Sequence, residues 1–334
     1  GDANARVDVR LAENQHLSAT WFYGRDKVEF YSNTFGSSSD ERYTIRNGVL
    51  ALNYNWHINP RTSWRAHASV STYYHAFDDD KFDINRIHGN VNYTEADIFR
   101  RNSGNDIRSL KLGVYGNQRI KKRLEFSYGA EWEELDYGLF LDRAQQYQYG
   151  DMISTVDSFS GTAHREDART MALFGDATYR ITDRWKVKAG LRAPWYGYGA
   201  YRNFLPEPKV LAIFELNPHS TVNFAFNLQQ QSTKLLGYTT LEGYFREFYT
   251  TADAISPPST SYQWSMGYFA GFNNDRGSRG GTNWIDNLSV EVFYKKQKGL
   301  ARFIPSTDED RDVLNYEHFL HFDGGSTTYG AEFL

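Results

Sequence analysis

The chain has 334 residues, a formal net charge of -4 at pH 7 and no cysteine. The absence of cysteine excludes disulfides, thiolate catalysis and Cys-ligated metals, and the slightly acidic balance offers no basic surface for nucleic acid. Aromatic residues make up 16% of a chain that is only 40% hydrophobic, which is more than an ordinary soluble core needs. This composition is typical of transmembrane β-barrels, because only half of each strand faces lipid and aromatic girdles mark both interfaces.

No apolar run in the sequence comes close to the roughly 18 to 20 residues that a membrane-spanning helix needs. A helical membrane protein is therefore excluded. Alternation of apolar and other residues begins already at Ala5, Val7 and Val9, so any targeting segment is expected to have been removed or to lie outside this sequence.

Six predicted β-hairpins follow one another along the chain. In each, apolar residues alternate with polar or small ones, the chain reverses at a turn, and the alternation resumes. The sixth hairpin is expected to join 262–272 with 288–294. The tight turns of the first five are expected near Asn14, Pro60, Lys122, Asp183 and Pro218.

The third hairpin indicates what lies on the second face of these strands. The apolar residues that follow its turn alternate with Glu125, Glu131 and Glu133. Carboxylates at this spacing cannot lie in a dry sandwich core, but they suit a water-filled lumen. The sequence therefore predicts strands with one face in lipid and the other in water.

The links between hairpins are expected to be much longer than the turns. The polar stretch 32–42 and the segment 76–105 are predicted to be long connections. Short turns at one end and long loops at the other are the arrangement of outer-membrane barrels, in which the short turns are periplasmic.

Tryptophan placement favours the same architecture. Trp56, Trp64 and Trp185 lie close to tight turns, whereas Trp132 lies well beyond one. About nine residues of tilted strand climb roughly 20 Å, close to the ~25 Å apolar band of such barrels. The two sets are therefore expected to mark the two membrane interfaces.

Five segments carry a more specific signal. In chain order they read ITDRWKVKAGLR, LPEPKV, ELNPHST, LSVEVFYKK and TYGAEFL. This succession of turn and strand motifs resembles the barrel of TonB-dependent outer-membrane transporters, in particular those of the Bacteroidetes type. The segments occupy 181–192, 205–210, 215–221, 288–296 and 328–334.

The resemblance implies an all-β fold, an antiparallel transmembrane β-barrel of about 22 strands that is plugged by an N-terminal globular domain. About 13 strands are predicted within residues 1–334, too few for such a barrel. The sequence is therefore expected to be an outer-membrane β-barrel segment of a larger receptor, with the plug domain, the TonB box and the last strands outside it. A receptor of this family lies in the outer membrane of a Gram-negative bacterium.

The resemblance also implies a function. Such a receptor captures a scarce solute with its extracellular loops and plug, and the TonB–ExbB–ExbD motor drives import through the N-terminal part. The solute would be a siderophore, cobalamin, a glycan or a peptide. The expected partners are this solute, outer-membrane lipid, the motor and a surface lipoprotein, and neither enzyme activity nor a cofactor is expected.

Two other classes of protein share features of this sequence. A passive outer-membrane porin or hydrophobic-solute channel would show the same alternation, but it would conduct without TonB. A soluble β-sandwich that binds glycans would also be rich in Tyr and Trp, but it would stay in solution without detergent.

Aromatic residues in two predicted loop segments are the candidate ligand contacts. Flat rings beside glycine and charge suit stacking on a sugar or an aromatic chelate. The alternative is that these rings belong to an interface girdle or pack within loops. The candidates are Trp195, Tyr196, Tyr198, Tyr201, Tyr244, Phe245, Phe248 and Tyr249.

Other polar clusters carry weaker signals. The acidic runs 78–80 and 308–310 could hold calcium, but neither has the EF-hand spacing, so solvated loops are favoured. His164, followed by an Arg-Glu-Asp run, has no nucleophile spacing or Gly-rich elbow around it. No catalytic or metal-binding residue is therefore predicted.

Overall fold

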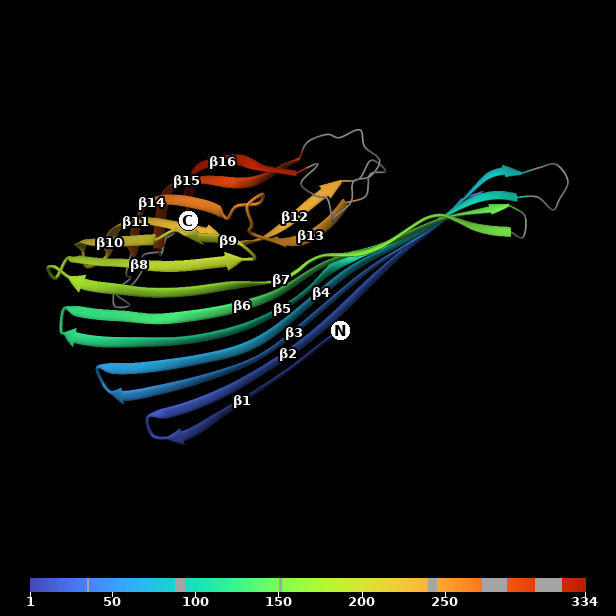
Figure 1. Ribbon diagram of the computed structural model, residues 1–334. Helices are drawn as coiled ribbons and strands as arrows, with labels where there is room; N and C mark the ends of the chain where they lie inside the picture. The colour runs from blue at the N-terminus through green and yellow to red at the C-terminus, as the bar shows by residue number, and fades with distance from the viewer. Residues whose placement is uncertain (35, 88–93, 150–151, 240–244, 272–286, 304–319) are drawn as a thin grey trace, which may run out of the picture.

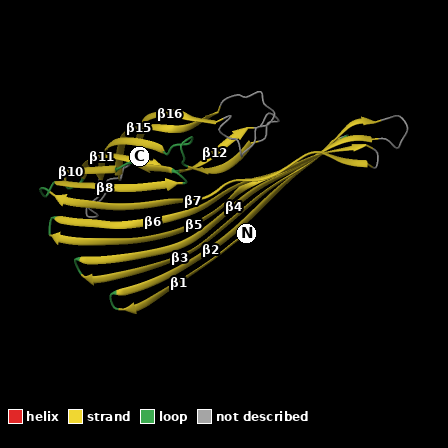
Figure 2. Cartoon of the chain, in the orientation of Figure 1, coloured by secondary structure: helices red, strands yellow, loops and turns green. Residues whose placement is uncertain are grey.

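The computed structural model describes residues 1–334 apart from 35, 88–93, 150–151, 240–244, 272–286 and 304–319. The described residues form strands joined by turns (Figure 1, Figure 2), and their strand pairs are antiparallel. None of these residues forms a helix long and apolar enough to cross a membrane.

Thirteen strands follow one another as neighbours in one sheet. A further short strand of this sheet, β9, pairs with β8 only, and β12 and β13 form a separate two-stranded sheet. The all-β, antiparallel prediction is therefore confirmed. The main sheet contains β1 (Asp2–Ala12), β2 (Gln15–Thr34), β3 (Ser37–Asn59), β4 (Thr62–Ile87), β5 (Thr94–Lys121), β6 (Leu124–Tyr149), β7 (Met152–Arg180), β8 (Trp185–Tyr198), β9 (Tyr201–Phe204), β10 (Glu207–Asn217), β11 (Ser220–Gln231), β14 (Ser259–Gly271), β15 (Asn287–Phe303) and β16 (Leu320–Phe333); the second sheet contains β12 (Thr233–Thr239) and β13 (Phe245–Thr251).

The five predicted tight turns are confirmed, and they share one end of the sheet. Short side chains help to close them. The Oδ1 atom of Asn59 accepts a hydrogen bond from the N–H of Arg61 at 2.8 Å, and Asn217 Oδ1 accepts one from His219 at 2.9 Å. Asparagine favours tight reversals in this way. The predicted sixth hairpin also forms, because β14 pairs with β15.

The long connections predicted at 32–42 and 76–105 are wrong. β2 and β3 stay paired as far as Thr34 and Ser37, and β4 and β5 as far as Ile87 and Thr94. These strand ends, with those of β6 and β7, form a twisted ribbon that reaches away from the other strands (Figure 1). We call this ribbon the extension.

The extension has no regular apolar–polar alternation. Ion pairs and aromatic contacts between its strands stabilise it instead. Arg42 Nε donates to Glu29 Oε1 at 2.8 Å across neighbouring strands. The ring of Tyr43 packs on Phe77 with 4.6 Å between centroids and meets Phe30 at 6.2 Å. Cross-strand pairs of this kind stabilise a sheet without a regular buried face. The sequence pattern therefore reads as a loop although the backbone is paired.

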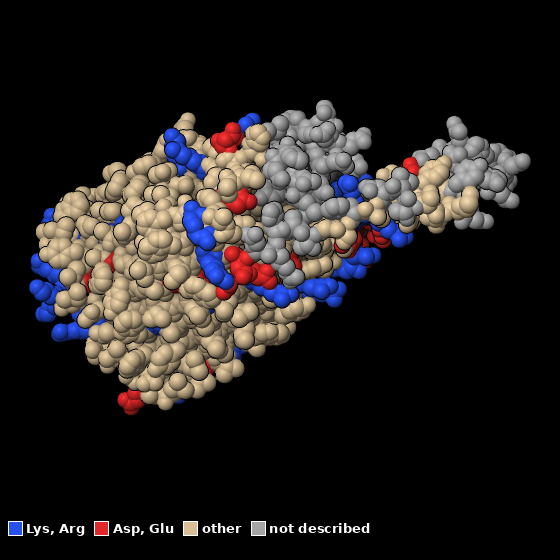
Figure 3. Space-filling view, viewed as in Figure 1, with Lys and Arg blue, Asp and Glu red and all other residues tan. Residues whose placement is uncertain are grey.

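The main sheet has two distinct faces. We call the face that carries the β12–β13 hairpin the inner face and the opposite one the outer face. On the outer face apolar side chains form rows in register across the strands, for example Val210, Phe226, Trp264 and Tyr294. Figure 3 shows a broad surface with few charged side chains between the short-turn end, at left, and the extension. This pattern agrees with the predicted lipid-facing band.

The hydrophobic core lies on the inner face and is built around the hairpin. It joins side chains of β5 and β6 to side chains of β16, although these strands lie far apart in the sheet order. The sheet is therefore curled around the hairpin. In the described residues β1 pairs only with β2 and β16 only with β15, so the curled sheet is not closed. The core consists of Ile107, Tyr137, Leu139, Leu141, Leu236, Phe248, Leu320 and Phe322.

Leu191 tests the assignment of the outer face to lipid. It lies on β8 between Trp185 and Trp195 and is 48% exposed. Leu191→Arg is expected to cost ~2 to 4 kcal/mol of folding free energy, because a charge near the bilayer midplane loses its hydration. Denaturant titration of the full chain in phosphatidylcholine vesicles measures this loss.

Ser127→Arg is the matched control for that experiment. Ser127 lies on the inner face opposite Asp176, so an arginine there stays near water and a carboxylate. A much smaller loss is expected, and equal losses at the two positions would contradict the lipid-facing assignment.

Candidate functional site

The β12–β13 hairpin is fixed to the inner face by side chains of β4, β5 and β6. Asn105 Nδ2 donates to the carbonyl of Tyr249 at 3.2 Å, and its Oδ1 accepts from the Tyr249 N–H at 2.7 Å. The Tyr137 hydroxyl donates to the same carbonyl at 2.5 Å. The ring of Tyr73 meets that of Tyr249 edge-on at 5.0 Å. Asn105 is fully buried and satisfies the backbone of β13 as a neighbouring strand would.

A second attachment comes from β8. The Tyr196 hydroxyl lies 2.5 Å from Thr251 Oγ1 and donates to the carbonyl of Ala252 at 2.7 Å. Tyr196 and Tyr198 are both buried in a small cluster with Ala252. Because side chains alternate along a strand, the same β8 segment turns its intervening residues to the outer face.

Lys234 ties the hairpin to the other side of the curled sheet. Its ammonium donates to the carbonyls of Pro257 at 2.5 Å and Gly299 at 3.2 Å and to Ser256 Oγ at 3.2 Å. It also lies 4.6 Å from the ring centroid of Phe322. Gly299 interrupts the register of β15 with a φ of 72°, a region that favours glycine. Burial lowers the pKa of Lys234 to about 8, because the cation has lost most of its hydration.

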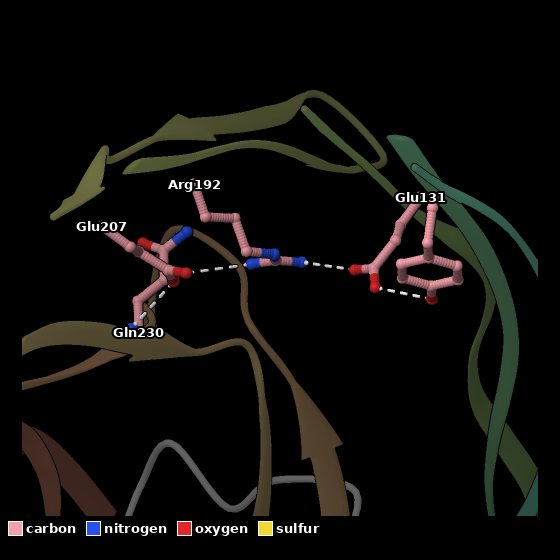
Figure 4. Close-up of polar contacts among 5 residues, drawn as sticks. Glu131, Arg192, Glu207 and Gln230 are labelled. Carbon is pink, nitrogen blue, oxygen red and sulfur yellow. Dashed lines mark hydrogen bonds and ion pairs between the residues drawn. The ribbon is translucent and has the colours of Figure 1, made fainter. Parts of the chain in front are cut away.

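A chain of polar contacts crosses the inner face from β4 towards β10. The guanidinium of Arg65 lies 4.4 Å from the ring centroid of Tyr115. The Tyr115 hydroxyl donates to Glu131 Oε1 at 2.9 Å, and the other carboxylate oxygen of Glu131 accepts from Arg192 at 3.5 Å. Arg192 then reaches Glu207 Oε2 at 3.0 Å. Figure 4 shows Glu131, Arg192 and Glu207 pointing toward one another from separate strands.

Arg192 is the centre of this network. Its side chain is 34% exposed, whereas those of Glu131 and Glu207 are 20% and 9% exposed. The second oxygen of Glu207 accepts from the backbone N–H of Gln230 at 3.1 Å. Two carboxylates thus share one guanidinium, and each has a further hydrogen-bond donor. Such additional donors are what make an ion pair tolerable away from bulk water.

A separate ion pair lies nearer the short turns. Lys209 Nζ is 2.8 Å from Asp176 Oδ1, and Gly190 lies between these two residues in the register of β7, β8 and β10. A Cβ at Gly190 would come within 1.8 Å of the Asp176 oxygen and 2.7 Å of Lys209 Cε. Glycine at this position therefore leaves room for the pair.

A pocket of about 290 Å³ lies between the inner face and the start of the hairpin. It is walled by β6, β7, β8 and the segment 230–233. Glu133, Thr170, Arg192 and Tyr196 supply its polar groups. A space of this size lies at the lower limit of small-molecule pockets, so it suits one polar group of a solute better than a whole large ligand.

The inner face carries groups that can bind a polar solute. Its side chains offer hydrogen-bond donors and acceptors of alternating charge to a polar solute or to bridging water. Among the described residues no group of three or more His, Asp or Glu side chains could hold a metal ion. The acidic run 78–80 lies in the extension, where Asp79 and Lys81 are 3.7 Å apart. The run 308–310 and the side chains of 164–166 lie outside the described residues.

The eight predicted ligand contacts do not form one surface. Trp195 lies on the outer face, 47% exposed. Tyr244 lies outside the described residues, and so does the side chain of Phe245. Ligand contact remains a prediction for all eight residues. Five of the eight pack against other side chains on the inner face: Tyr196, Tyr198, Tyr201, Phe248 and Tyr249.

The sequence analysis did not predict the β12–β13 hairpin or the ion pair between Arg192 and Glu207. These two residues face each other in register, but they are separated by the short strand β9 in the sequence. The only available signal is opposite charge at inner-facing positions of neighbouring strands. That signal cannot be recognised before the register is known.

Removing the central guanidinium tests the network. Arg192→Met is expected to lower the stability of the chain by about 1 to 3 kcal/mol, because Glu131 and Glu207 are left without their cation. Thermal unfolding in detergent measures the change. Adding Glu207→Gln to the variant is expected to restore part of the loss, and an unchanged stability of Arg192→Met would refute the role given to the bridge.

Asn105→Ala tests how the hairpin is held. The backbone N–H and carbonyl of Tyr249 lose their partner, so amide hydrogens of 245–251 are expected to exchange faster by roughly tenfold. Hydrogen–deuterium exchange read by mass spectrometry gives the rates. Asn117→Ala is the control, since Asn117 bonds to Glu125 and not to the hairpin. The same acceleration in both variants would argue against a local attachment.

Comparisons with known proteins give the family of the chain. A family model described as "TonB dependent receptor-like, beta-barrel" matches residues 3–334. Comparison with curated protein sequences yields no match. The structure of the RagAB peptide transporter is similar at a TM-score of 0.59 and 10% identity, over 99% of this chain and 44% of that chain. The siderophore receptor PirA from Pseudomonas aeruginosa gives a TM-score of 0.45 at 12% identity, over 99% of this chain and 62% of that one.

The chain thus spans less than half the length of the RagAB chain that it matches. At 10% identity that likeness concerns the fold alone, a wall of antiparallel strands. The family model, by contrast, covers nearly the whole sequence. The chain belongs to the family of TonB-dependent receptor-like β-barrels.

Proposed function

We propose that this chain forms part of the barrel wall of an outer-membrane receptor that imports a scarce solute with energy from TonB. The observation that carries the proposal is the family match over residues 3–334. The two faces of the sheet support it, because an apolar outer face suits lipid and a charged inner face suits a water-filled path.

In this mechanism the hairpin and the adjacent pocket bind the solute on its way inward. The solute enters from the end that carries the extension and the hairpin, opposite the short turns. It exchanges its hydration for hydrogen bonds with Glu133, Thr170 and Arg192. The motor then displaces a plug domain, and the polar inner face conducts the solute towards the short-turn end. A surface lipoprotein that delivers solute would approach the extension.

The charge pattern of the inner face suggests which solute class to test first. Glu131, Arg192 and Glu207 alternate in sign within a few ångströms. A peptide carries amides and both signs of charge, so it can replace the water around such a network. A siderophore, cobalamin and a glycan are the other classes to compare.

Uptake by cells tests the proposal. Radiolabelled peptides, a ferric siderophore, cobalamin and an oligosaccharide are supplied to cells that carry the full-length receptor, with and without the inner-membrane motor. Uptake of one class is expected to require both the receptor and the motor. Uptake that survives loss of the motor, together with ion conductance of the purified receptor, would instead support a passive channel.

Glu133→Gln tests the pocket once the solute class is known. The half-saturation concentration for uptake is expected to rise roughly five- to tenfold, because a charge-assisted hydrogen bond becomes a neutral one. Glu125→Gln is the control, since Glu125 lies on the same inner face near the short turns and outside the pocket. Equal effects of the two substitutions would remove the pocket from the mechanism.

A further inference from the structure

Two cavities on the outer face share a wall. One is a groove of about 400 Å³ with an almost entirely apolar lining from β5 to β8, including Ala130, Trp132 and Leu173. The other, of about 500 Å³, lies towards the extension and contains polar groups of β7, β8 and β9. Met171 and Trp195 line both cavities. Together they form one amphipathic depression, which we call the composite groove.

The polar part of the composite groove contains two guanidinium groups in different environments. Arg169 donates to Glu134 Oε1 at 2.8 Å and lies 3.7 Å from the Oδ2 atom of Asp167, which also lines this cavity, so these two carboxylates compensate its charge. Arg202 is exposed, and its Nη1 donates to the carbonyls of Gly199 at 2.6 Å and Tyr201 at 2.7 Å. Within the described part of the chain no carboxylate pairs with Arg202. Its positive charge is therefore available to an anion.

Local structure holds Arg202 beside the apolar part of the groove. The tight turn between β8 and β9 contains Gly199 with a φ of 51°. The turn places Arg202 opposite Gly197, where a Cβ would lie 3.2 Å from Arg202 Cδ. Two residues further on, Phe204 stacks on Trp195 with 5.0 Å between ring centroids. Phe204 therefore packs beside Trp195 of the shared wall, and Arg202 lies two residues from Phe204 on the same strand.

We propose that the composite groove binds an anionic, phosphate-bearing lipid of the surrounding membrane, with an acyl chain in the apolar part and the phosphate at Arg202. This inference rests on the membrane location in the proposed function. An acyl chain matches an apolar groove on a face that meets lipid, and a phosphate matches a guanidinium without a carboxylate partner. The site lies on the opposite face from the proposed solute path, so the two can be separated by experiment.

Native mass spectrometry of the full-length receptor tests the proposal. The receptor in detergent is titrated with dioleoyl phosphatidylglycerol, dioleoyl phosphatidylcholine or inorganic phosphate. Phosphatidylglycerol is expected to bind about tenfold more tightly than phosphatidylcholine, which has the same acyl chains but a cationic headgroup. Inorganic phosphate at equal concentration is expected not to displace it, because the acyl chain contributes to binding. Equal affinities for the two lipids, or displacement by phosphate, would overturn the proposal.

Two substitutions locate the site. Arg202→Gln is expected to remove the preference for phosphatidylglycerol, whereas Arg100→Gln, which removes one positive charge from the extension, is expected to keep it. Ala130→Phe fills the apolar groove and is expected to weaken both lipids. If Ala130→Phe does not fold, Ala130→Leu takes its place. The same lipid preference in Arg202→Gln and Arg100→Gln would refute the site.

Solute uptake, measured in parallel, is expected to be unchanged in Arg202→Gln, so failure of the lipid site and failure of the import mechanism give different results.

Discussion

Contact with two media at once is the constraint on which the rest of this structure depends. Each strand of the main sheet places apolar side chains on one face and polar ones on the other, because successive side chains of a strand alternate. A slip of one residue would exchange the two sets. Rows on both faces therefore enforce one register. Trp264 packs between Phe226 and Tyr294 outside, while Lys209 pairs with Asp176 inside.

A sheet with a wet inner face has no hydrophobic core of its own, and the β12–β13 hairpin supplies one. Leu236 and Phe248 bring apolar surface to the inner face, where it is buried against β5, β6 and β16. The hairpin also needs partners for its own backbone, and buried Asn105 provides them. Polar and apolar contacts thus attach the same element to the wall.

Much of the sheet could be predicted from the sequence, because many of the interactions that form it join residues that are close together in the chain. In the turns at Asn59 and Asn217 the asparagine side chain bonds to the backbone two residues later, so the local pattern reveals these turns. The extension could not be predicted, because pairs such as Arg42 with Glu29 replace alternation there. The candidate site was harder still. Arg192 and Glu207 meet only once β8 and β10 are aligned. The positions of the aromatic residues predicted to lie in loops depend on the β12–β13 hairpin, which no local sequence pattern indicated.

The attachments of the hairpin have a mechanical consequence. Tyr249 is held by β5 and β6, Thr251 by β8, and Lys234 by β15 with the ring of Phe322 from β16. The hairpin therefore acts as a brace between the two sides of the curled sheet and contributes to the curvature of the wall. A change in that curvature, wherever it begins, must either stretch these contacts or move the brace. The curvature of the wall and the position of the hairpin are thus coupled.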